Sequence, residues 1–240
     1  MGIYSRREQG VYGPSLDVMA LGVEYHGAIV DALAERRGLL DAALDALTAR
    51  ADVLTEVAML LVETLRAGRK VLVAGNGGSA AEAQHFAAEL VGRFKRDRAP
   101  YAVIALTTDT SILTAVANDY GYQEVFARQV AALGQPGDLF IAFSTSGESE
   151  NMLRAASAGH ERLLRVVALT GEQQSRLEDL ADITVRTPGI DAATVQELHM
   201  LITHLLCDIV ETRLAEEHSE SGEESDNGQL PLVVREDGWL

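Results

Sequence analysis

Residues 74–90 read AGNGGSAAEAQHFAAEL, a glycine-rich loop that leads directly into a helical segment. The apolar run Lys70–Ala74 before the loop predicts a buried strand, and residues 79–94 after it predict a helix. A strand, a glycine loop and a helix in this order are typical of the first unit of a parallel α/β sheet, with the loop at the carboxyl end of the strand. This stretch therefore sets the fold class and gives the first candidate site.

The same alternation continues along the chain. Further strands are predicted at Tyr101–Leu106, Asp138–Phe143, Leu164–Leu169 and Ile183–Arg186, and a long final helix at Ala192–Leu214. Mostly apolar strands that alternate with helices indicate a parallel sheet covered on both faces. The sequence thus predicts a doubly wound α/β fold, a parallel five-stranded sheet flanked by helices in a flavodoxin-like three-layer sandwich.

Two helical segments precede the first strand, one from Asp17 onward and an amphipathic one over Leu39–Arg66. They predict an N-terminal helical extension, of a kind that often covers a neighbouring subunit. The expected organisation is a flexible N-terminus at 1–16, a single domain at 17–215 that includes these helices, and a C-terminal tail at 216–240. The tail is acidic and serine-rich, a composition typical of disorder.

Composition excludes several classes of function. The net charge of −16 argues against nucleic acid as a partner, because neutralising phosphates requires a basic face. No apolar run approaches the roughly 18–20 residues of a membrane span, and the N-terminus lacks the apolar segment of a secretory signal. The single cysteine, Cys207, cannot form an internal disulfide, which favours a reducing, cytoplasmic compartment.

The glycine loop also satisfies the dinucleotide pattern G-x-G-x-x-G/A over Gly75–Ala80. A dinucleotide site further needs an acidic residue about 20 residues on, at the end of the second strand, to bind the ribose. Here the second strand ends at Leu106, and the first acid after it is Asp109. The dinucleotide interpretation fits poorly. A tight turn that uses glycine only for backbone room stays as the plain alternative.

A second loop offers a better explanation. The third predicted strand ends in Ser144-Thr145-Ser146-Gly147, and Ser149 opens the next helix. Loops at the carboxyl ends of neighbouring strands can meet over one ligand, and a helix N-terminus with hydroxyl donors suits a phosphate monoester. This chemistry needs no lysine or arginine, so an acidic protein can use it. Read alone, STSGES is an ordinary helix N-cap; the pairing of two such loops favours phosphate binding.

Candidate metal ligands lie on two predicted helices. His85 and Glu89 are four residues apart and share a helix face, which suits zinc binding or acid–base catalysis, although an exposed polar pair has the same spacing. On the final helix, Gln196 and His204 are eight residues apart, and Gln196 is the weaker candidate because glutamine is an uncommon zinc ligand. Two further residues of that helix are expected to pack rather than to bind: His199 and Cys207.

Four stretches carry a resemblance to a known family. GNGGSAAEAQHFAAEL, TAVAND, STSGES and VQELHMLITHLLCDIVE resemble the sugar isomerase (SIS) domain and, within it, the phosphoheptose isomerases, also called sedoheptulose 7-phosphate isomerases. The likeness runs from about Leu39 to Glu211, and the motifs follow the family's order and spacing. The resemblance implies a ketose–aldose isomerase that converts sedoheptulose 7-phosphate into D-glycero-D-manno-heptose 7-phosphate for heptose biosynthesis.

The resemblance also implies roles for matching residues. Glu89 and His204 correspond to the catalytic pair. The implied cofactor is zinc, with ligands at His85, Glu89, Gln196 and His204. The implied substrate-binding positions are Asn76, Gly77, Gly78, Ser79, Glu89, Asn118, Asp119, Ser144, Thr145, Ser146, Ser149 and Gln196, with the phosphate held by Ser79 and the serine-rich loop. The family's assembly is a homotetramer with active sites at subunit interfaces, so ligands from different chains can converge.

A relative of another class shares this fold. The DnaA-associating replication-initiation protein resembles the same segments but is a binding protein, and a phosphosugar sensor is a second non-catalytic alternative. In the replication-initiation branch the positions of Glu89 and His204 are typically not kept as Glu and His. This sequence has both residues, which favours the enzyme.

Overall fold

The computed structural model describes residues 18–189 and 191–220. The flexible N-terminus predicted at 1–16 and residues 221–240 of the predicted tail lie outside these described residues. Residues 18–42 form one compact unit and residues 43–220 belong to a second, which carries the sheet and every candidate site residue. The prediction of a single domain over 17–215 stays a prediction.

Five parallel strands form one sheet in the order β2-β1-β3-β4-β5. The strands are β1 (Val71–Gly75), β2 (Val103–Ala105), β3 (Leu139–Ser144), β4 (Arg165–Gly171) and β5 (Ile183–Thr187). This is the flavodoxin-like order, so the predicted doubly wound fold is confirmed. Because β1 pairs directly with β3, the chain changes direction across the sheet between them, and the loops that follow these two strands leave the same edge side by side.

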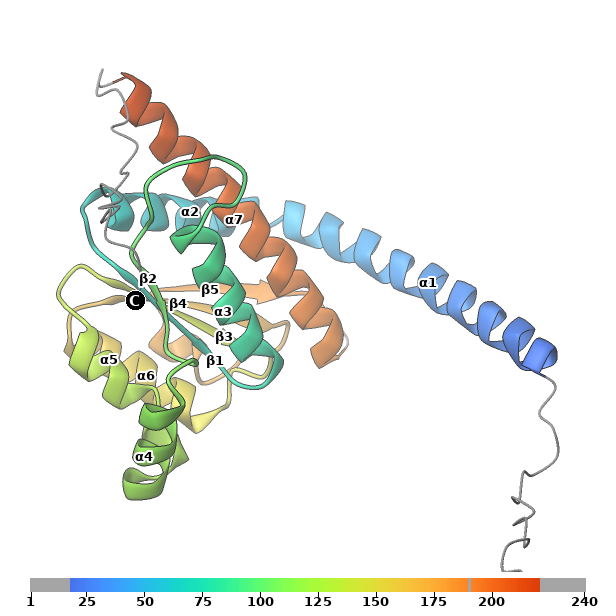
Figure 1. The fold of residues 1–240 in the computed structure, drawn as a ribbon, viewed down its shortest axis with the longest axis horizontal. Coiled ribbons are helices and arrows are strands. Elements are labelled where there is room, and N and C mark those ends of the chain that lie inside the picture. Colours follow the sequence, from blue (N-terminus) through green and yellow to red (C-terminus); the bar gives the residue numbers. More distant parts are fainter. Residues whose placement is uncertain (1–17, 190, 221–240) are drawn as a thin grey trace, which may run out of the picture. The chain divides into compact units, whose positions relative to one another are not determined.

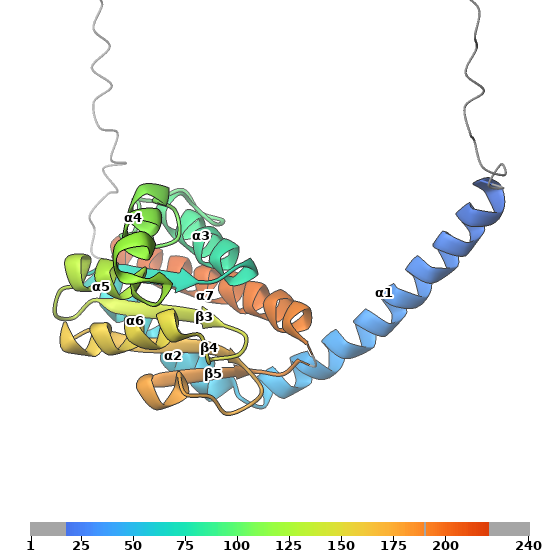
Figure 2. The same ribbon diagram turned by 90° about the horizontal axis from the view of Figure 1, so that it is seen from below.

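Helices cover both faces of the sheet (Figures 1 and 2). The helices of the second unit that follow β1 are α3 (Gly78–Val91), α4 (Thr110–Tyr120), α5 (Ala127–Leu133), α6 (Glu150–Glu161) and α7 (Ala192–Glu220). On one face, α5 and α6 pack on a core that contains Leu72 and Phe140. On the other face, α3 packs through Phe86 against Phe143, with ring centroids 6.3 Å apart, and α7 packs there as well. The helices that follow β1 and β3 thus lie on opposite faces of the sheet.

The amphipathic segment Leu39–Arg66 was expected to continue as one helix, and this is wrong. The structure has α1 (Val18–Thr48) and α2 (Ala51–Arg66), separated at residues 49–50. At the break, the Arg50 guanidinium donates two hydrogen bonds to Glu172, at 2.7 and 2.9 Å, and one of 2.9 Å to the Arg186 carbonyl. The side chain at the break thus binds a residue just beyond β4 and the backbone of β5.

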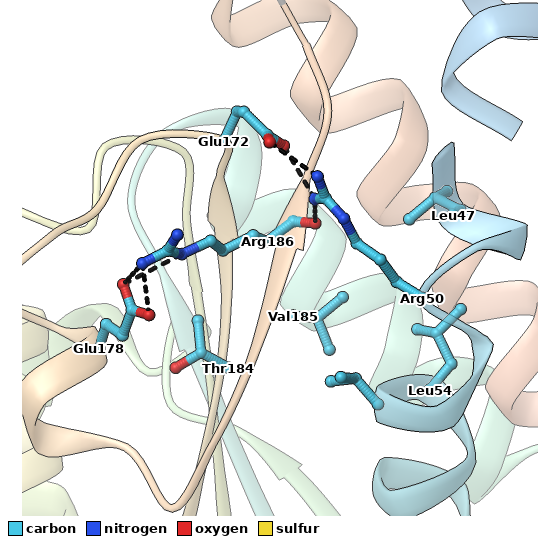
Figure 3. Close-up of a pocket in the computed structure, with 9 residues that line it drawn as sticks. Leu47, Arg50, Leu54, Glu172, Glu178, Thr184, Val185 and Arg186 are labelled. Carbon is cyan, nitrogen blue, oxygen red and sulfur yellow. Dashed lines mark hydrogen bonds and ion pairs between the residues drawn. The ribbon is translucent and has the colours of Figure 1, made fainter. Parts of the chain in front are cut away.

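A pocket of about 330 Å³ lies at this break (Figure 3). Its apolar wall includes Leu54 and Val185, and its polar rim contains the Arg50–Glu172 pair and the Arg186–Glu178 pair. The hydrogen bond with Arg50 holds the pKa of Glu172 below its ordinary value. Each guanidinium at the rim already has a carboxylate partner, so we interpret the pocket as a junction between α2 and β5.

The final helix was expected to end at Leu214 and instead continues to Glu220. The first five residues of the tail predicted at 216–240 therefore belong to this helix. None of the helices within residues 18–189 and 191–220 combines the length and apolarity that a membrane crossing requires.

Candidate active site

The loop after β1 requires glycine for more than chain flexibility. Gly77 precedes α3 with φ at 56°, in the left-handed region that favours glycine. A Cβ on Gly75 would lie 2.4 Å from the Ser79 carbonyl oxygen, which no side chain can accommodate without moving backbone. The backbone of the loop therefore passes very close to the first turn of α3. This helix begins without a side-chain cap.

The loop after β3 exposes donors at a helix start. Ser144 is buried at the end of β3, and its Oγ accepts a 3.1 Å hydrogen bond from the Gly147 N–H. Ser149 is the N-cap residue of α6, but its side chain makes no capping hydrogen bond. The ordinary N-cap interpretation of STSGES therefore does not account for this hydroxyl. The first turn of α6 begins without a side-chain cap, as an anion-binding helix N-terminus does.

Two asparagines join these loops. Asn76 Nδ2 donates to Asn151 Oδ1 at 2.9 Å, and Asn151 Nδ2 donates to Asn76 Oδ1 at 2.8 Å. The Tyr122 hydroxyl also donates to Asn76 Oδ1, at 2.9 Å. The glycine loop and the start of α6 are therefore in direct contact, as expected if they serve one ligand.

Three candidate side chains from α3 and α7 converge. His85 Nε2 lies 2.8 Å from His204 Nε2 and 3.1 Å from Glu89 Oε1. One ligand atom from each of the three residues lies within 4.8 Å of the others. The side chains of His85 and Glu89 are 39% and 20% exposed, so the cluster is open to solvent and to a ligand.

This donor set fits a divalent metal such as zinc. Catalytic zinc sites commonly use three protein ligands of the histidine and carboxylate type and leave a fourth position for water or substrate. Two ligand atoms on one tetrahedral zinc stand about 3.4 Å apart, given bonds of about 2.0–2.1 Å. The two distances from His85 Nε2 are close to that value, so small side-chain movements would complete the coordination.

The loop after α3 packs against this cluster. The Phe94 ring stacks on His204, with centroids 5.4 Å apart and planes at 22°. The loop is held by Glu211, which is fully buried on α7 and accepts backbone N–H hydrogen bonds from Phe94, Lys95 and Arg96 at 3.1, 2.7 and 2.9 Å. Burial raises the pKa of Glu211, but these three hydrogen bonds and the charge of Arg98 together hold it below its ordinary value.

Comparison with known proteins gives a consistent result. The family model of the SIS domain matches residues 38–171. The phosphoheptose isomerase of Thiobacillus denitrificans is 51% identical over 174 residues, which cover 71% of this chain and 88% of that protein. The solved structure of the phosphoheptose isomerase from Neisseria gonorrhoeae superposes with a TM-score of 0.71 at 39% identity, and the match covers 78% of this chain and 99% of that one. The chain belongs to the phosphoheptose isomerase family.

The match to the SIS model ends at Gly171, before α7 begins. In this phosphoheptose isomerase family member, His204 therefore lies outside the region that the general domain model recognises. One of the three cluster residues is therefore supplied by α7, a helix that begins after the matched range.

The remaining predicted site residues lie around the two loops. Gln196 packs on the start of α3, where a Cβ on Gly78 would lie 2.5 Å from its side-chain amide. That contact is two helical turns before His85 on α3, so Gln196 borders the glycine loop. The role of Gln196 as a fourth metal ligand stays a prediction. Ser79 is buried. Asn118 and Asp119 are exposed on α4 and hydrogen-bond to each other at 2.8 Å.

Two residues behave as the packing interpretation predicted. His199 is fully buried, and its Nε2 lies 3.2 Å from the Thr170 carbonyl oxygen. Cys207 is fully buried, and burial, followed by the negative charge of Glu89, raises the pKa of its thiol to about 12.

Sequence reasoning missed several residues that shape the site. Asn151 and Tyr122 carry no motif, and only the asparagine's place in the first turn after STSGES could have suggested it. Phe94 and Glu211 are brought to the cluster by contacts between segments more than 100 residues apart. Local patterns do not contain such pairings.

Proposed function

We propose that this phosphoheptose isomerase family member converts sedoheptulose 7-phosphate into D-glycero-D-manno-heptose 7-phosphate, with Glu89 and His204 as its acid–base residues. The observation that supports the residue assignment is the convergence of His85, Glu89 and His204, with His85 and Glu89 on the helix that follows the glycine loop. The relatives named phosphoheptose isomerase, at about half identity over most of their length, support the reaction.

The reaction moves one proton between neighbouring carbons. The Glu89 carboxylate removes a proton from C1 of the open-chain ketose, and the electron pair forms a C1–C2 double bond as the C2 oxygen is protonated. His204 supplies that proton and later accepts the one on the C1 hydroxyl oxygen. When the C1 carbonyl forms, Glu89 returns its proton to C2, so the aldose is an isomer of the starting ketose. The same histidine can transfer a proton to the ring oxygen of the sugar when the ring opens.

Each side chain is suited to its step by its surroundings. Glu89 is one helical turn beyond His85, and its side chain is largely buried, with Oε1 3.1 Å from His85 Nε2. Phe94 holds the His204 ring by stacking. The hydroxyls of Ser144, Thr145, Ser146 and Ser149, with the N-terminus of α6, would hold the phosphate and fix the reacting carbons near the cluster.

Zinc is the proposed metal, with His85, Glu89 and His204 as ligands and Gln196 as the fourth. When bound, it would polarise the substrate carbonyl and stabilise the negative charge that develops on oxygen. The support is the donor set itself, two imidazole nitrogens and a carboxylate within bonding reach of one point.

We also propose a cytoplasmic homotetramer with active sites at subunit interfaces. Large apolar side chains exposed along α1, such as Val23, Ile29 and Leu33, support burial of this helix in an assembly. Light scattering of the full chain tests this proposal, and a monomer at micromolar concentration would contradict it.

The first test is turnover with and without metal. The purified chain is expected to form aldose phosphate from sedoheptulose 7-phosphate, to lose this activity with a chelator and to regain it with Zn²⁺. His204→Ala should bind much less zinc than the wild-type chain, measured by elemental analysis. His160→Ala removes an exposed histidine of α6 and should leave the zinc content unchanged. Absence of product with and without added zinc would support the binding-protein alternative instead.

Gly78→Ala tests the role of Gln196. The new Cβ would meet the far end of a flexible side chain at 2.5 Å, so Gln196 can move and the free energy of unfolding should change little. The displaced amide should lower kcat/KM by about 10–100-fold, as a misplacement of about 1 Å can. Ser157→Ala, at an exposed position of α6, is the control and should leave kcat/KM unchanged. Wild-type kinetics in Gly78→Ala would remove Gln196 from the site.

A further inference from the structure

A buried polar layer lies between α3 and α7. Gln196 packs on Gly78, and His204 contacts His85, so the two helices run side by side in the same direction. Between these two contacts, Glu82 of α3 faces His199 of α7, with Oε2 and Nδ1 3.7 Å apart. Glu82 is 4% exposed and His199 is 0% exposed. The proposed mechanism uses neither side chain.

His199 contacts three parts of the site at once. Its Nε2 lies 3.2 Å from the carbonyl oxygen of Thr170, at the end of β4. Its ring meets Phe143 edge-on, with centroids 6.0 Å apart, directly before the serine-rich loop that begins at Ser144. Through Glu82 it faces α3, one turn before His85 on the same side of that helix. The imidazole thus joins the phosphate loop to the metal-binding helix.

The hydrogen-bonding needs of this pair are coupled. A carbonyl oxygen only accepts, so Nε2 of His199 must donate to Thr170, and in a neutral imidazole Nδ1 is then an acceptor. It faces Glu82, whose two oxygens accept no hydrogen bond from the described residues, and Nδ1 also lacks a partner there. At 3.7 Å the two atoms are too far apart for a direct hydrogen bond, so a bridging water would satisfy both groups, whereas leaving either unsatisfied costs about 1–3 kcal/mol. The two side chains therefore act as one unit.

We infer that Glu82 and His199 are a positioning pair for the isomerisation. The pair fixes α3 and α7 against the ends of β3 and β4, and so sets the distance between the phosphate loop and the cluster of His85, Glu89 and His204. The substrate carries its phosphate at C7 and reacts at C1 and C2, so this distance decides whether the reacting carbons meet Glu89. This inference rests on the proposed function.

Positioning predicts a particular kinetic signature. Weakening the pair removes no phosphate contact and no metal ligand, so substrate binding changes little, but it shifts these groups relative to one another. The reacting geometry is lost, which lowers the rate of the chemical step. Glu82→Gln, nearly isosteric, should lower kcat about 10–100-fold with KM within about threefold of wild type. The Glu82→Gln/His199→Gln double variant should lose hardly more than the worse single one, because the two groups act together.

The control is a buried carboxylate at the opposite edge of the sheet. Asp138 is 1% exposed at the start of β3, where it bonds to Lys70 and to the Gln135 N–H. Asp138→Asn should lower thermal stability without changing kcat of the folded enzyme. A second readout needs no turnover: with Co²⁺ in the site, the visible absorption spectrum should shift in Glu82→Gln but not in Asp138→Asn.

The outcomes separate cleanly. If wild-type enzyme is active and Glu82→Gln keeps kcat within twofold, or if Asp138→Asn loses kcat in the same proportion, the positioning role is wrong. If Glu82→Gln does not fold, His199→Gln, whose amide can still donate to Thr170, gives the same comparison. An inactive wild-type enzyme contradicts the proposed function instead, and the cobalt spectra then decide whether the pair positions the metal ligands.

Discussion

Glu89→Gln is expected to lower kcat for sedoheptulose 7-phosphate by about 10²–10⁴-fold, the range that a lost general base gives. The amide oxygen can still contact His85, as Glu89 Oε1 does now at 3.1 Å, so the cluster should keep its arrangement. What disappears is the carboxylate that accepts the C1 proton. KM should change far less than kcat, because phosphate binding involves other residues.

Two measurements make this prediction specific. Steady-state kinetics give kcat and KM, and exchange of substrate hydrogen with deuterated solvent reports the proton transfer itself. Both should fall together in Glu89→Gln. Zinc content is measured on the same samples, since an amide is a weaker ligand than a carboxylate. Glu63→Gln, an exposed glutamate on α2, is the control and should behave as wild type. Full turnover in Glu89→Gln would show that another group is the base.

The second large effect concerns stability. Glu211→Gln is expected to lower the free energy of unfolding by about 3–5 kcal/mol, as the breaking of a buried ion pair does. Glu211 accepts three backbone N–H hydrogen bonds and pairs with Arg98 Nε at 3.1 Å, and both side chains are buried. A glutamine would place its NH₂ group, itself a donor, against the backbone N–H donors of the loop. It would also leave the charge of Arg98 without its carboxylate partner. Chemical denaturation monitored by circular dichroism measures the loss.

Asp208→Asn is the matched control for this variant. Asp208 lies on the same helix and pairs with Lys95 in the same loop at 2.8 Å, but its side chain is 38% exposed. Exposed pairs contribute about 0–1 kcal/mol, so this variant should stay within that range of wild type. If both variants lose the same amount, the buried hydrogen bonds of Glu211 are not the cause.

The dependence on pH has a definite sign. The pKa of Glu211 in the folded protein lies below its ordinary value of about 4.3, so its contribution is complete above that value. The contribution is lost as pH falls through the folded pKa, because the unfolded chain binds the proton more readily. The stability difference between wild type and Glu211→Gln should therefore be largest near neutral pH and shrink in acid. A difference that grows in acid would contradict this account.

The fold could be predicted because its signals are local. Apolar runs such as Lys70–Ala74 mark strands, and the glycines of the first loop and the hydroxyls of the second mark strand ends. The missing ribose acid near Leu106 argued against a dinucleotide site, and the sheet has the flavodoxin-like order. The His85–Glu89 spacing indicated one helix face, and the structure brings both residues together.

The errors and omissions have one physical origin. The helix break at Arg50 coincides with contacts to Glu172 and Arg186, more than 120 residues away, and no glycine or proline marks it. Glu82 and Glu211 looked like ordinary charged residues, because what makes them special is burial against distant partners. Side chains whose roles come from tertiary contacts cannot be found from spacing along the chain.

The cluster draws His85 and Glu89 from α3 and His204 from the last helix, with the rest of the sheet encoded between them. During synthesis the N-terminal parts of a chain emerge first. If the cluster binds a metal ion as proposed, a nascent chain that lacks α7 has only two of the three ligands and would bind the ion weakly until α7 leaves the ribosome. The metallated pool would then exclude prematurely terminated chains.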